Sequence, residues 1–187
     1  MAARGRLWLL GLLMVALAGI APLRDAAAQA DINNLLILPR AAANDDFESV
    51  LGLLQRGDYV DTDGEDDRTA LSYAAGNGNM RIANLLLDHL AAIDHRDRFG
   101  DTALHWAALN GKNEMIKRLL AAKADINMQN REGVTALMMA ISNNRREVVR
   151  TLVASGADIQ VQDFTGHDAL SWARDKPGIL SILKQAH

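Results

Sequence analysis

The sequence contains no cysteine, few aromatic residues and no excess of basic residues. The absence of cysteine excludes a disulfide framework, a zinc site with thiolate ligands and a thiol nucleophile. Aromatic residues make up 4% of the chain, which disfavours a sheet sandwich whose core is built from aromatic and β-branched pairs. The formal net charge is −3, whereas a nucleic-acid-binding surface normally requires a clear basic excess. The composition therefore favours a protein of closely packed helices that does not bind nucleic acid.

Residues 1–30 differ in chemistry from the remainder of the chain. They open with Arg4 and Arg6, continue with an apolar run over residues 7–20 and end with Ala28-Gln29-Ala30. Small residues at these last positions are what a signal peptidase reads. The apolar run is also shorter than the roughly 20 residues that a membrane-spanning helix needs. We therefore interpret residues 1–30 as a signal peptide cleaved after Ala30; the alternative is an uncleaved membrane anchor.

The expected compartment is the bacterial periplasm. An exported protein without cysteine is ordinary there, whereas eukaryotic secreted proteins commonly carry disulfides. The sequence also lacks an Asn-x-Ser/Thr acceptor for glycosylation, which eukaryotic secreted surfaces often carry. After cleavage of the signal peptide we expect no association with the membrane.

A three-residue motif recurs every 33 residues along the rest of the chain. Its copies are Thr69-Ala70-Leu71, Thr102-Ala103-Leu104, Thr135-Ala136-Leu137 and the altered Asp168-Ala169-Leu170. One further step back places Leu38 at the same position. The spacing therefore divides residues 31–187 into five units, with approximate boundaries at 31–63, 64–96, 97–129, 130–162 and 163–187.

The third unit predicts two short helices joined by a turn. Residues 102–109 include small alanines that allow close packing, and Asn110-Gly111 breaks this helix. Residues 114–122 carry apolar side chains at helical spacing, and an extended turn follows them. Helices this short cannot bury their apolar faces alone, so neighbouring units must stack and share one core. We predict an all-α solenoid of about five helix-turn-helix units with short hairpin loops.

The unit resembles that of the ankyrin-repeat family, which runs D-x-x-G-x-T-P-L-H-x-A-A-x-x-G, a helix ending in two leucines, and then G-A-D-x-N. The third unit supplies Asp97, Gly100, Thr102, Leu104, His105, Ala107, Ala108, Gly111, Leu119, Leu120, Ala124, Asp125 and Asn127. The fourth unit supplies Asn130, Gly133, Thr135, Leu137, Ala140, Leu152, Gly156, Ala157 and Asp158. The resemblance covers about residues 36–187. It implies an ankyrin-repeat solenoid that binds another protein, and we expect no cofactor and a monomer.

Some positions depart from the family pattern. Leu90 and Lys123 stand where the family has glycine after the second helix, a position that usually requires a left-handed backbone. Each should cost about 1 kcal/mol of strain if that conformation is kept. Asn144 replaces the glycine between the helices, and asparagine tolerates left-handed geometry better than most residues. Alanine also replaces the family's proline in every copy of the motif, and it remains a good helix former.

No residue is assigned to catalysis or to metal binding. In the ankyrin family the histidine at the position of His105 is structural and ties the first helix to the backbone of a neighbouring turn. No glycine-rich phosphate loop, Ser-His-Asp set or two-carboxylate cleft can be placed. The methionine and tryptophan residues of the first helices are interpreted as lying in or beside the repeat stack: Trp106, Met138, Met139 and Trp172.

The acidic segment Asp58–Asp67 has the densest negative charge of the chain. Carboxylates of this kind could bind calcium. The glycine comes too early for an EF-hand loop, however, and the residue at the twelfth position would be Ser72 rather than glutamate. We therefore interpret the segment as a solvated hairpin tip between units one and two, or as an acidic contact patch, with calcium binding as the alternative.

The resemblance places the partner-binding surface on the hairpin tips and on the exposed side of the first helices, which line a concave face in ankyrin folds. Phe99 and Phe164 have no evident structural reason to lie in turns, and exposed aromatic residues beside arginine are typical of binding hot spots. The alternative is that each phenylalanine packs onto a neighbouring hairpin. The residues expected to contact a partner are Arg68, Asn77, Arg96, Arg98, Phe99, Asp101, Leu109, Asn110, Gln129, Arg131, Glu132, Val134, Asn143, Phe164 and His167.

We therefore expect a non-enzymatic scaffold in the periplasm that binds a partner protein through this concave face. One alternative is an inhibitor or immunity protein that blocks a toxin arriving in the periplasm. A second alternative, from a different class, is a metal-dependent or hydrolytic enzyme that uses the carboxylates of Asp58–Asp67.

Overall fold

The computed structural model describes residues 37–185. This part of the chain forms ten α-helices and one 3-10 turn and contains no strand, which confirms the predicted all-α class. The expected signal peptide and its cleavage site after Ala30 lie outside the described residues. None of the helices within residues 37–185 is long and apolar enough to span a membrane.

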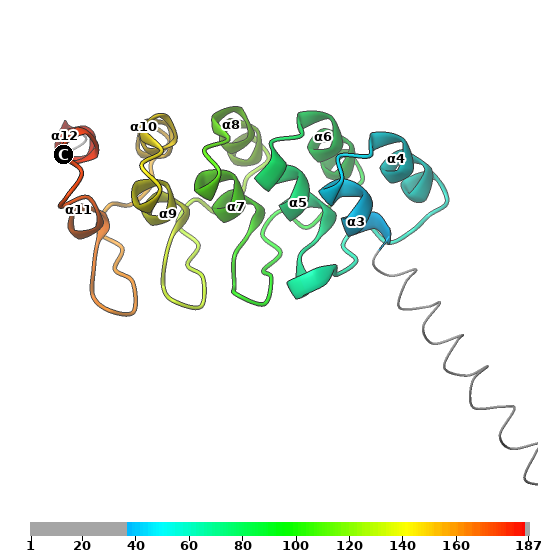
Figure 1. Ribbon diagram of the computed structural model, residues 1–187, viewed down its shortest axis with the longest axis horizontal. Helices are drawn as coiled ribbons and strands as arrows, with labels where there is room; N and C mark the ends of the chain where they lie inside the picture. The colour runs from blue at the N-terminus through cyan, green and yellow to red at the C-terminus, as the bar shows by residue number, and fades with distance from the viewer. Residues whose placement is uncertain (1–36, 186–187) are drawn as a thin grey trace, which may run out of the picture. The chain divides into compact units, whose positions relative to one another are not determined.

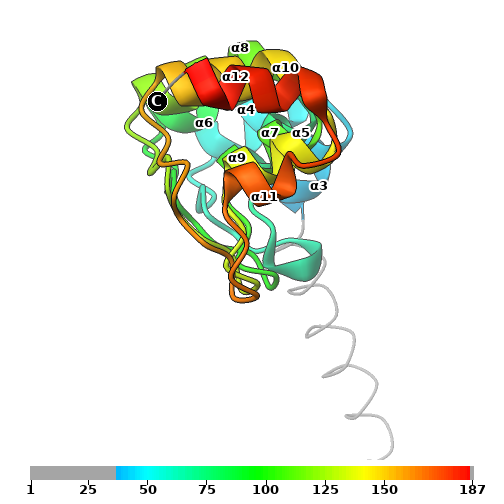
Figure 2. The same ribbon diagram turned by 90° about the vertical axis from the view of Figure 1, so that its left-hand side faces the viewer.

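The helices form five consecutive pairs that stack side by side, one pair in each expected unit (Figure 1). The first helices of the pairs make one row, the second helices make another, and the intervening hairpins project from the first row. In the end-on view the hairpins overlay on the same side (Figure 2). The pairs are α3 (Ile37–Ala43) with α4 (Phe47–Gln55), α5 (Ala70–Asn77) with α6 (Met80–Asp88), α7 (Ala103–Leu109) with α8 (Asn113–Ala121), α9 (Ala136–Ser142) with α10 (Arg146–Ala154), and α11 (Ala169–Trp172) with α12 (Pro177–Gln185).

The recurring motif residues begin the first helix in units two to five. The side chains of Thr69, Thr135 and Asp168 accept a hydrogen bond from the backbone N–H three residues later. This caps one of the N–H groups that a helix start leaves without a partner. The alanine after each cap is the first helical residue, where the family's proline would pre-set the backbone. The caps therefore fix the 33-residue register of the helices.

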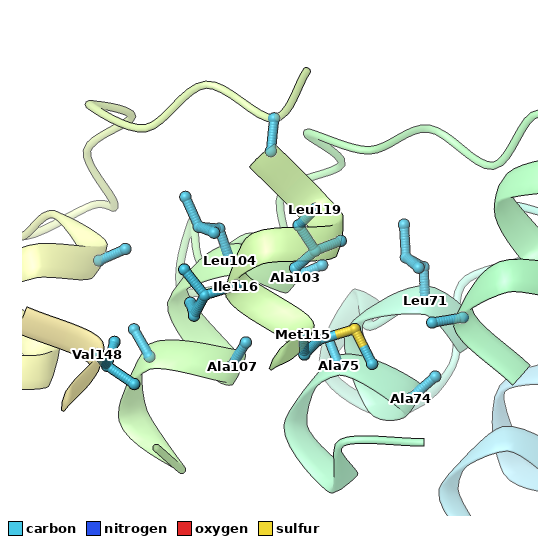
Figure 3. Close-up of a cluster of buried hydrophobic side chains, with 14 of the residues drawn as sticks. Leu71, Ala74, Ala75, Ala103, Leu104, Ala107, Met115, Ile116, Leu119 and Val148 are labelled. Atoms are coloured by element: carbon cyan, nitrogen blue, oxygen red, sulfur yellow. The ribbon is translucent and has the colours of Figure 1, made fainter. Parts of the chain in front are cut away.

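The core runs along the stack between the two rows of helices. Its leucines recur with the motif, and Leu71, Leu104 and Leu137 are each about 1% exposed. Small alanines between them, such as Ala74 and Ala107, are fully buried and let neighbouring first helices approach closely. Figure 3 shows side chains of α5, α7, α8 and α10 meeting in one continuous cluster. Each pair of helices therefore buries its apolar side only against its neighbours.

The turns after the second helices adopt the predicted left-handed backbone. Leu90 has φ 63° and Lys123 has φ 73°, while Gly57 and Gly156 occupy the same place with φ 87° and 92°. Asn144 also has the expected left-handed conformation, with φ 54°. The fold therefore keeps a left-handed backbone at these three positions without glycine, the residue that adopts it most easily.

A ladder of hydrogen bonds links the turns of successive units. In each step a polar side chain of one unit accepts from a backbone N–H of the next: Asp61 from Ala92, Asp94 from Asp125, and Asn127 from Asp158. The distances are 2.9, 3.1 and 2.9 Å. These bonds satisfy backbone groups between units and add polar specificity to the apolar stack.

Candidate functional site

Three of the four hairpins, those of units three to five, are each closed by one buried polar side chain at the first position. Oδ1 of Asp97 accepts the backbone N–H groups of Phe99 and Asp101, both at 2.9 Å. Asn130 and Asp163 do the same in the next two units. Because a single side chain satisfies the backbone of the turn, the tip residues are held in place while their own side chains remain free for contact.

Neighbouring hairpins are joined directly through their backbones. Arg98 N–H donates to the Asp66 carbonyl at 2.9 Å, Arg131 N–H to the Phe99 carbonyl at 3.0 Å, and Phe164 N–H to the Glu132 carbonyl at 3.1 Å. The four hairpin tips, residues 65–67, 98–99, 131–132 and 164–165, therefore form one continuous row. We call this row, together with the exposed sides of α5, α7, α9 and α11, the hairpin/first-helix face.

Two of the predicted hot-spot side chains are exposed on this row. Phe164 is 73% exposed and Phe99 is 46% exposed. The Phe99 ring lies 5.2 Å from the guanidinium carbon of Arg98, which forms a 2.7 Å ion pair with Asp66. Neither ring is buried, although the Phe164 ring lies against Gly133 of the preceding hairpin. The tips therefore present aromatic surface beside charged groups.

Several residues expected to contact a partner instead form hydrogen bonds to backbone carbonyls within the repeat stack. Arg96 donates to the carbonyl of Gln129 at 2.9 Å, and Gln129 donates to the carbonyl of Gln162 at 2.8 Å. Asn77 donates to the Ala43 carbonyl. Asn143 donates to a carbonyl of its own helix. Their side chains have a structural role even where they remain solvent-accessible.

Asp101 and Val134 differ from the expectation that they contact a partner. They are only 8% and 6% exposed. Oδ1 of Asp101 accepts from Asn130 at 2.9 Å, because the next hairpin closes over this position. We therefore remove both residues from the candidate surface. Leu109 is half-buried. The other expected residues that do not make these hydrogen bonds are exposed: Asn110, Arg131, Glu132 and His167.

Arg68 is held between two aromatic rings on this face. Its guanidinium carbon lies 4.1 Å from the centre of the Tyr73 ring and 3.7 Å from that of Trp106. Burial lowers the pKa of Arg68 from its usual range, and the nearby Tyr73 and Asp97 oppose this change. The sequence identified Arg68 as a contact residue but assigned Trp106 to the stack. It is the half-buried indole of Trp106 that completes the sandwich.

His105 has the structural role predicted for it. Its Nδ1 lies 3.2 Å from the backbone N–H of Thr102 and accepts from it, and its Nε2 lies 3.0 Å from the Val134 carbonyl and donates to it. This pattern requires a neutral ring with its proton on Nε2. Burial lowers the pKa of His105, and the nearby Asp101 partly opposes this effect. The residue therefore ties α7 to the next hairpin.

Two carboxyl groups of the hairpins have shifted pKa values. Burial raises the pKa of Asp101, which the hydrogen bond from Asn130 partly offsets. Burial also acts to raise the pKa of Asp163, but hydrogen bonds from the Thr165 hydroxyl, the backbone and the Trp172 indole lower it to about 2. Asp163 therefore stays ionised as an acceptor at the centre of its hairpin.

The carboxylates of Asp58–Asp67 do not converge on one point. Asp58 pairs with Arg56 at 2.8 Å, and Asp63 lies 3.1 Å from the imidazole of His95. Asp61 belongs to the ladder between turns. Within residues 37–185 no group of three or more His, Asp or Glu side chains is placed to hold a metal ion. The segment therefore contributes separate contacts, with Asp66 and Asp67 at a hairpin tip.

Comparison with known proteins agrees with this architecture. A family model described as ankyrin repeats (3 copies) matches residues 38–130, 90–163 and 108–184. No curated protein matches the chain. The matched ranges together cover all five helix pairs, and they carry the caps, glycines and His105 described above. The chain therefore belongs to the ankyrin-repeat family.

Proposed function

We propose that this protein is a periplasmic, non-enzymatic scaffold that binds a partner protein through the hairpin/first-helix face. Ankyrin repeats commonly mediate protein–protein interaction, and such domains are typically non-enzymatic. The observation that carries the choice of face is the row of tips with exposed Phe99 and Phe164. Aromatic and arginine side chains are the groups most enriched at energetic centres of interfaces.

The rigidity of the face supports the same proposal. The tips are fixed by side chains such as Asp97 and by one backbone hydrogen bond at each junction. A surface that is already ordered loses less conformational entropy when a partner binds. A face that spans several units also offers room for the roughly 800 Å² per partner that a specific interface buries.

The binding proposal is tested by capture and crosslinking from a periplasmic extract, with Phe164→Ala and Phe99→Ala as the altered baits. Each should weaken recovery of a specific partner with little change in the thermal midpoint, because neither ring is buried. Leu90→Ala is the matched control, since Leu90 is 86% exposed but lies in the turn after α6. Equal recovery by wild type and both phenylalanine variants would refute the choice of face.

The expected location needs a separate test. The basic start, apolar run and Ala28-Gln29-Ala30 support export and cleavage after Ala30. Fractionation of cells that produce the tagged chain should place it in the periplasmic fraction. Sequencing of its N-terminus should then begin at Asp31, whereas an intact N-terminus in the membrane fraction would favour the anchor interpretation.

A further inference from the structure

We propose that Arg68 and Asn110 form a receptor for one acidic side chain of the partner protein, directly above Gly76. This inference rests on the proposed scaffold function and deepens it by specifying the chemistry of the partner. It depends on two features of the described residues: an arginine without an anion, and an amide beside it that makes no hydrogen bond.

Arg68 has no anionic partner within residues 37–185. Its Nε is buried and makes no hydrogen bond with the described residues, and no carboxylate among them forms an ion pair with its guanidinium. The tyrosine and tryptophan rings restrain the guanidinium plane from both sides. A planar, partly desolvated guanidinium is suited to bind a carboxylate with two parallel hydrogen bonds.

The neighbouring carboxylates are already used by other groups. Both oxygens of Asp97 accept hydrogen bonds, Oδ1 from the turn backbone and Oδ2 from the Trp106 indole at 2.9 Å. Asp66 is paired with Arg98. The carboxyl group of Asp101 is buried and accepts from Asn130. The charge of Arg68 therefore remains available for a group from outside the chain.

Asn110 points its amide to the same place. The position that a Cβ on Gly76 would occupy lies 3.4 Å from Nδ2 of Asn110 and 3.5 Å from Nη2 of Arg68. The equivalent amides of Asn77 and Asn143 donate to backbone carbonyls, whereas the Asn110 amide makes no such bond in the described part of the chain. Both donors therefore lie over the same residue of α5.

A carboxylate that approaches from the exposed side of Asn110 could accept from both donors. A glutamate or aspartate from an extended partner segment crossing α5 and α7 fits this arrangement, because the positive charge and the two donors are complementary to a carboxylate.

The test is a selection of peptides from a displayed random library on the purified chain, followed by calorimetry with individual synthetic peptides. Selected peptides should carry Asp or Glu at one fixed position, and replacement of that residue by its amide should weaken binding about tenfold or more. Arg68→Gln should cause a loss of similar size. Arg68→Lys should bind as weakly as Arg68→Gln, since lysine lacks the planar guanidinium that donates two parallel hydrogen bonds.

Asn110→Ala keeps the test informative if Arg68→Gln disturbs folding. Asn110 is exposed and its amide makes no hydrogen bond with the described residues, so the substitution should leave the thermal midpoint unchanged and should weaken binding by removing one of the two donors. Arg150→Gln on α10 is the control for an equal change of net charge.

The failure of this inference is distinguishable from failure of the scaffold function. Acidic peptides that bind Arg68→Gln as tightly as wild type, neutral selected peptides, or no selected peptide at all would each overturn the carboxylate receptor. Binding that is lost in Phe164→Ala but unchanged in Arg68→Gln would leave the scaffold function intact. Tighter binding of a phosphopeptide than of its glutamate counterpart would assign the site to phosphate instead.

Discussion

In units three to five, the first residue of the hairpin matches the polar group that lies next to its side chain. Asp97 and Asp163 each accept a hydrogen bond from a tryptophan indole at 2.9 Å, from Trp106 and Trp172 respectively. The fourth unit has Asn130 at this position, and it donates its amide to Asp101 instead. Aspartate thus occurs where an indole N–H must be satisfied, because a carboxylate only accepts whereas an asparagine amide also donates.

Asp163→Asn should therefore destabilise the last unit by about 1–3 kcal/mol, the cost of leaving a buried donor without a partner. The new amide N–H groups would face the indole N–H of Trp172. In a Trp172→Met background, which reproduces the Asn–Met combination of unit four, the same change should cost much less. Urea unfolding of the four proteins of this cycle gives the coupling free energy, and a coupling near zero would contradict the proposed pairing.

His105 should make stability depend on pH in the mildly acidic range. Burial lowers its pKa in the folded state, so the unfolded chain binds a proton first as the pH falls below about 6.5. The free energy of unfolding should then decrease from that pH downward, by at most about 1.4 kcal/mol per pH unit for one proton, until the folded pKa is reached. The opposite shift of Asp101 acts in the other direction at lower pH.

The measurement is urea unfolding of wild type and His105→Ser between pH 7.5 and 5.5. Unit two already has Ser72 at this position next to its capping threonine, so serine is compatible with the local fold. The variant should be less stable at pH 7.5 and should lose less stability on acidification. Parallel pH profiles for the two proteins would show that another group titrates.

Among the elements, the hairpins show how closely one unit packs against the next. A Cβ at Gly133 would lie 2.6 Å from the backbone nitrogen of Phe164 in the next hairpin, whereas a Cβ at Gly166 would meet nothing within 4 Å. Both glycines have positive φ, 79° and 84°. The two positions therefore share backbone strain but differ in what the next unit places against them.

Gly133→Ala should consequently destabilise the protein more than Gly166→Ala. The backbone strain of roughly 1–2 kcal/mol is common to both substitutions, and the clash at Gly133 should add about 1–3 kcal/mol. Thermal and urea unfolding of the two variants measure the difference directly. If the two alanine variants were equally stable, the close contact between neighbouring hairpins would not be maintained in solution.

The sequence predicted the elements well because their determinants are local and repeated. The predicted helices of the third unit, 102–109 and 114–122, are observed at Ala103–Leu109 and Asn113–Ala121. The left-handed conformation of Leu90 and Lys123 also followed from their place in the repeat. The structural role of His105 followed from the resemblance to the ankyrin family.

The details of the candidate site were harder to predict because they depend on contacts between units. The sandwich of Arg68 uses Tyr73 of its own unit and Trp106 of the next one. The burial of Asp101 likewise depends on Asn130, 29 residues further along the chain. A repeat register shows which residues occupy equivalent positions, but not which long side chains reach across to a neighbour.

At the scale of the whole molecule, the core extends in one direction, along the stack of helix pairs. Each helix pair packs only against the pairs before and after it, so α12 contacts α10 and α11, whereas α8 lies between neighbours on both sides. The first helix of the last unit, α11 (Ala169–Trp172), is also shorter than the first helices of the other units. Stability in such a stack is the sum of unit terms and nearest-neighbour interfaces, and the terminal pair has one interface fewer.

Replacement of a buried isoleucine by alanine should therefore destabilise more of the molecule in a central unit than in the terminal unit. Ile116 in α8 and Ile179 in α12 are both fully buried, and replacement of either by alanine should cost about 2–5 kcal/mol locally. Ile179→Ala should speed amide hydrogen exchange in α11 and α12 and leave α5 to α8 protected. Ile116→Ala should speed exchange in every pair, because it weakens both interfaces of a central unit.

Mass spectrometry of exchanged fragments separates the two patterns. Uniformly faster exchange in Ile179→Ala would instead mean that residues 37–185 unfold as a single cooperative unit, with interfaces strong enough to carry the loss along the whole stack.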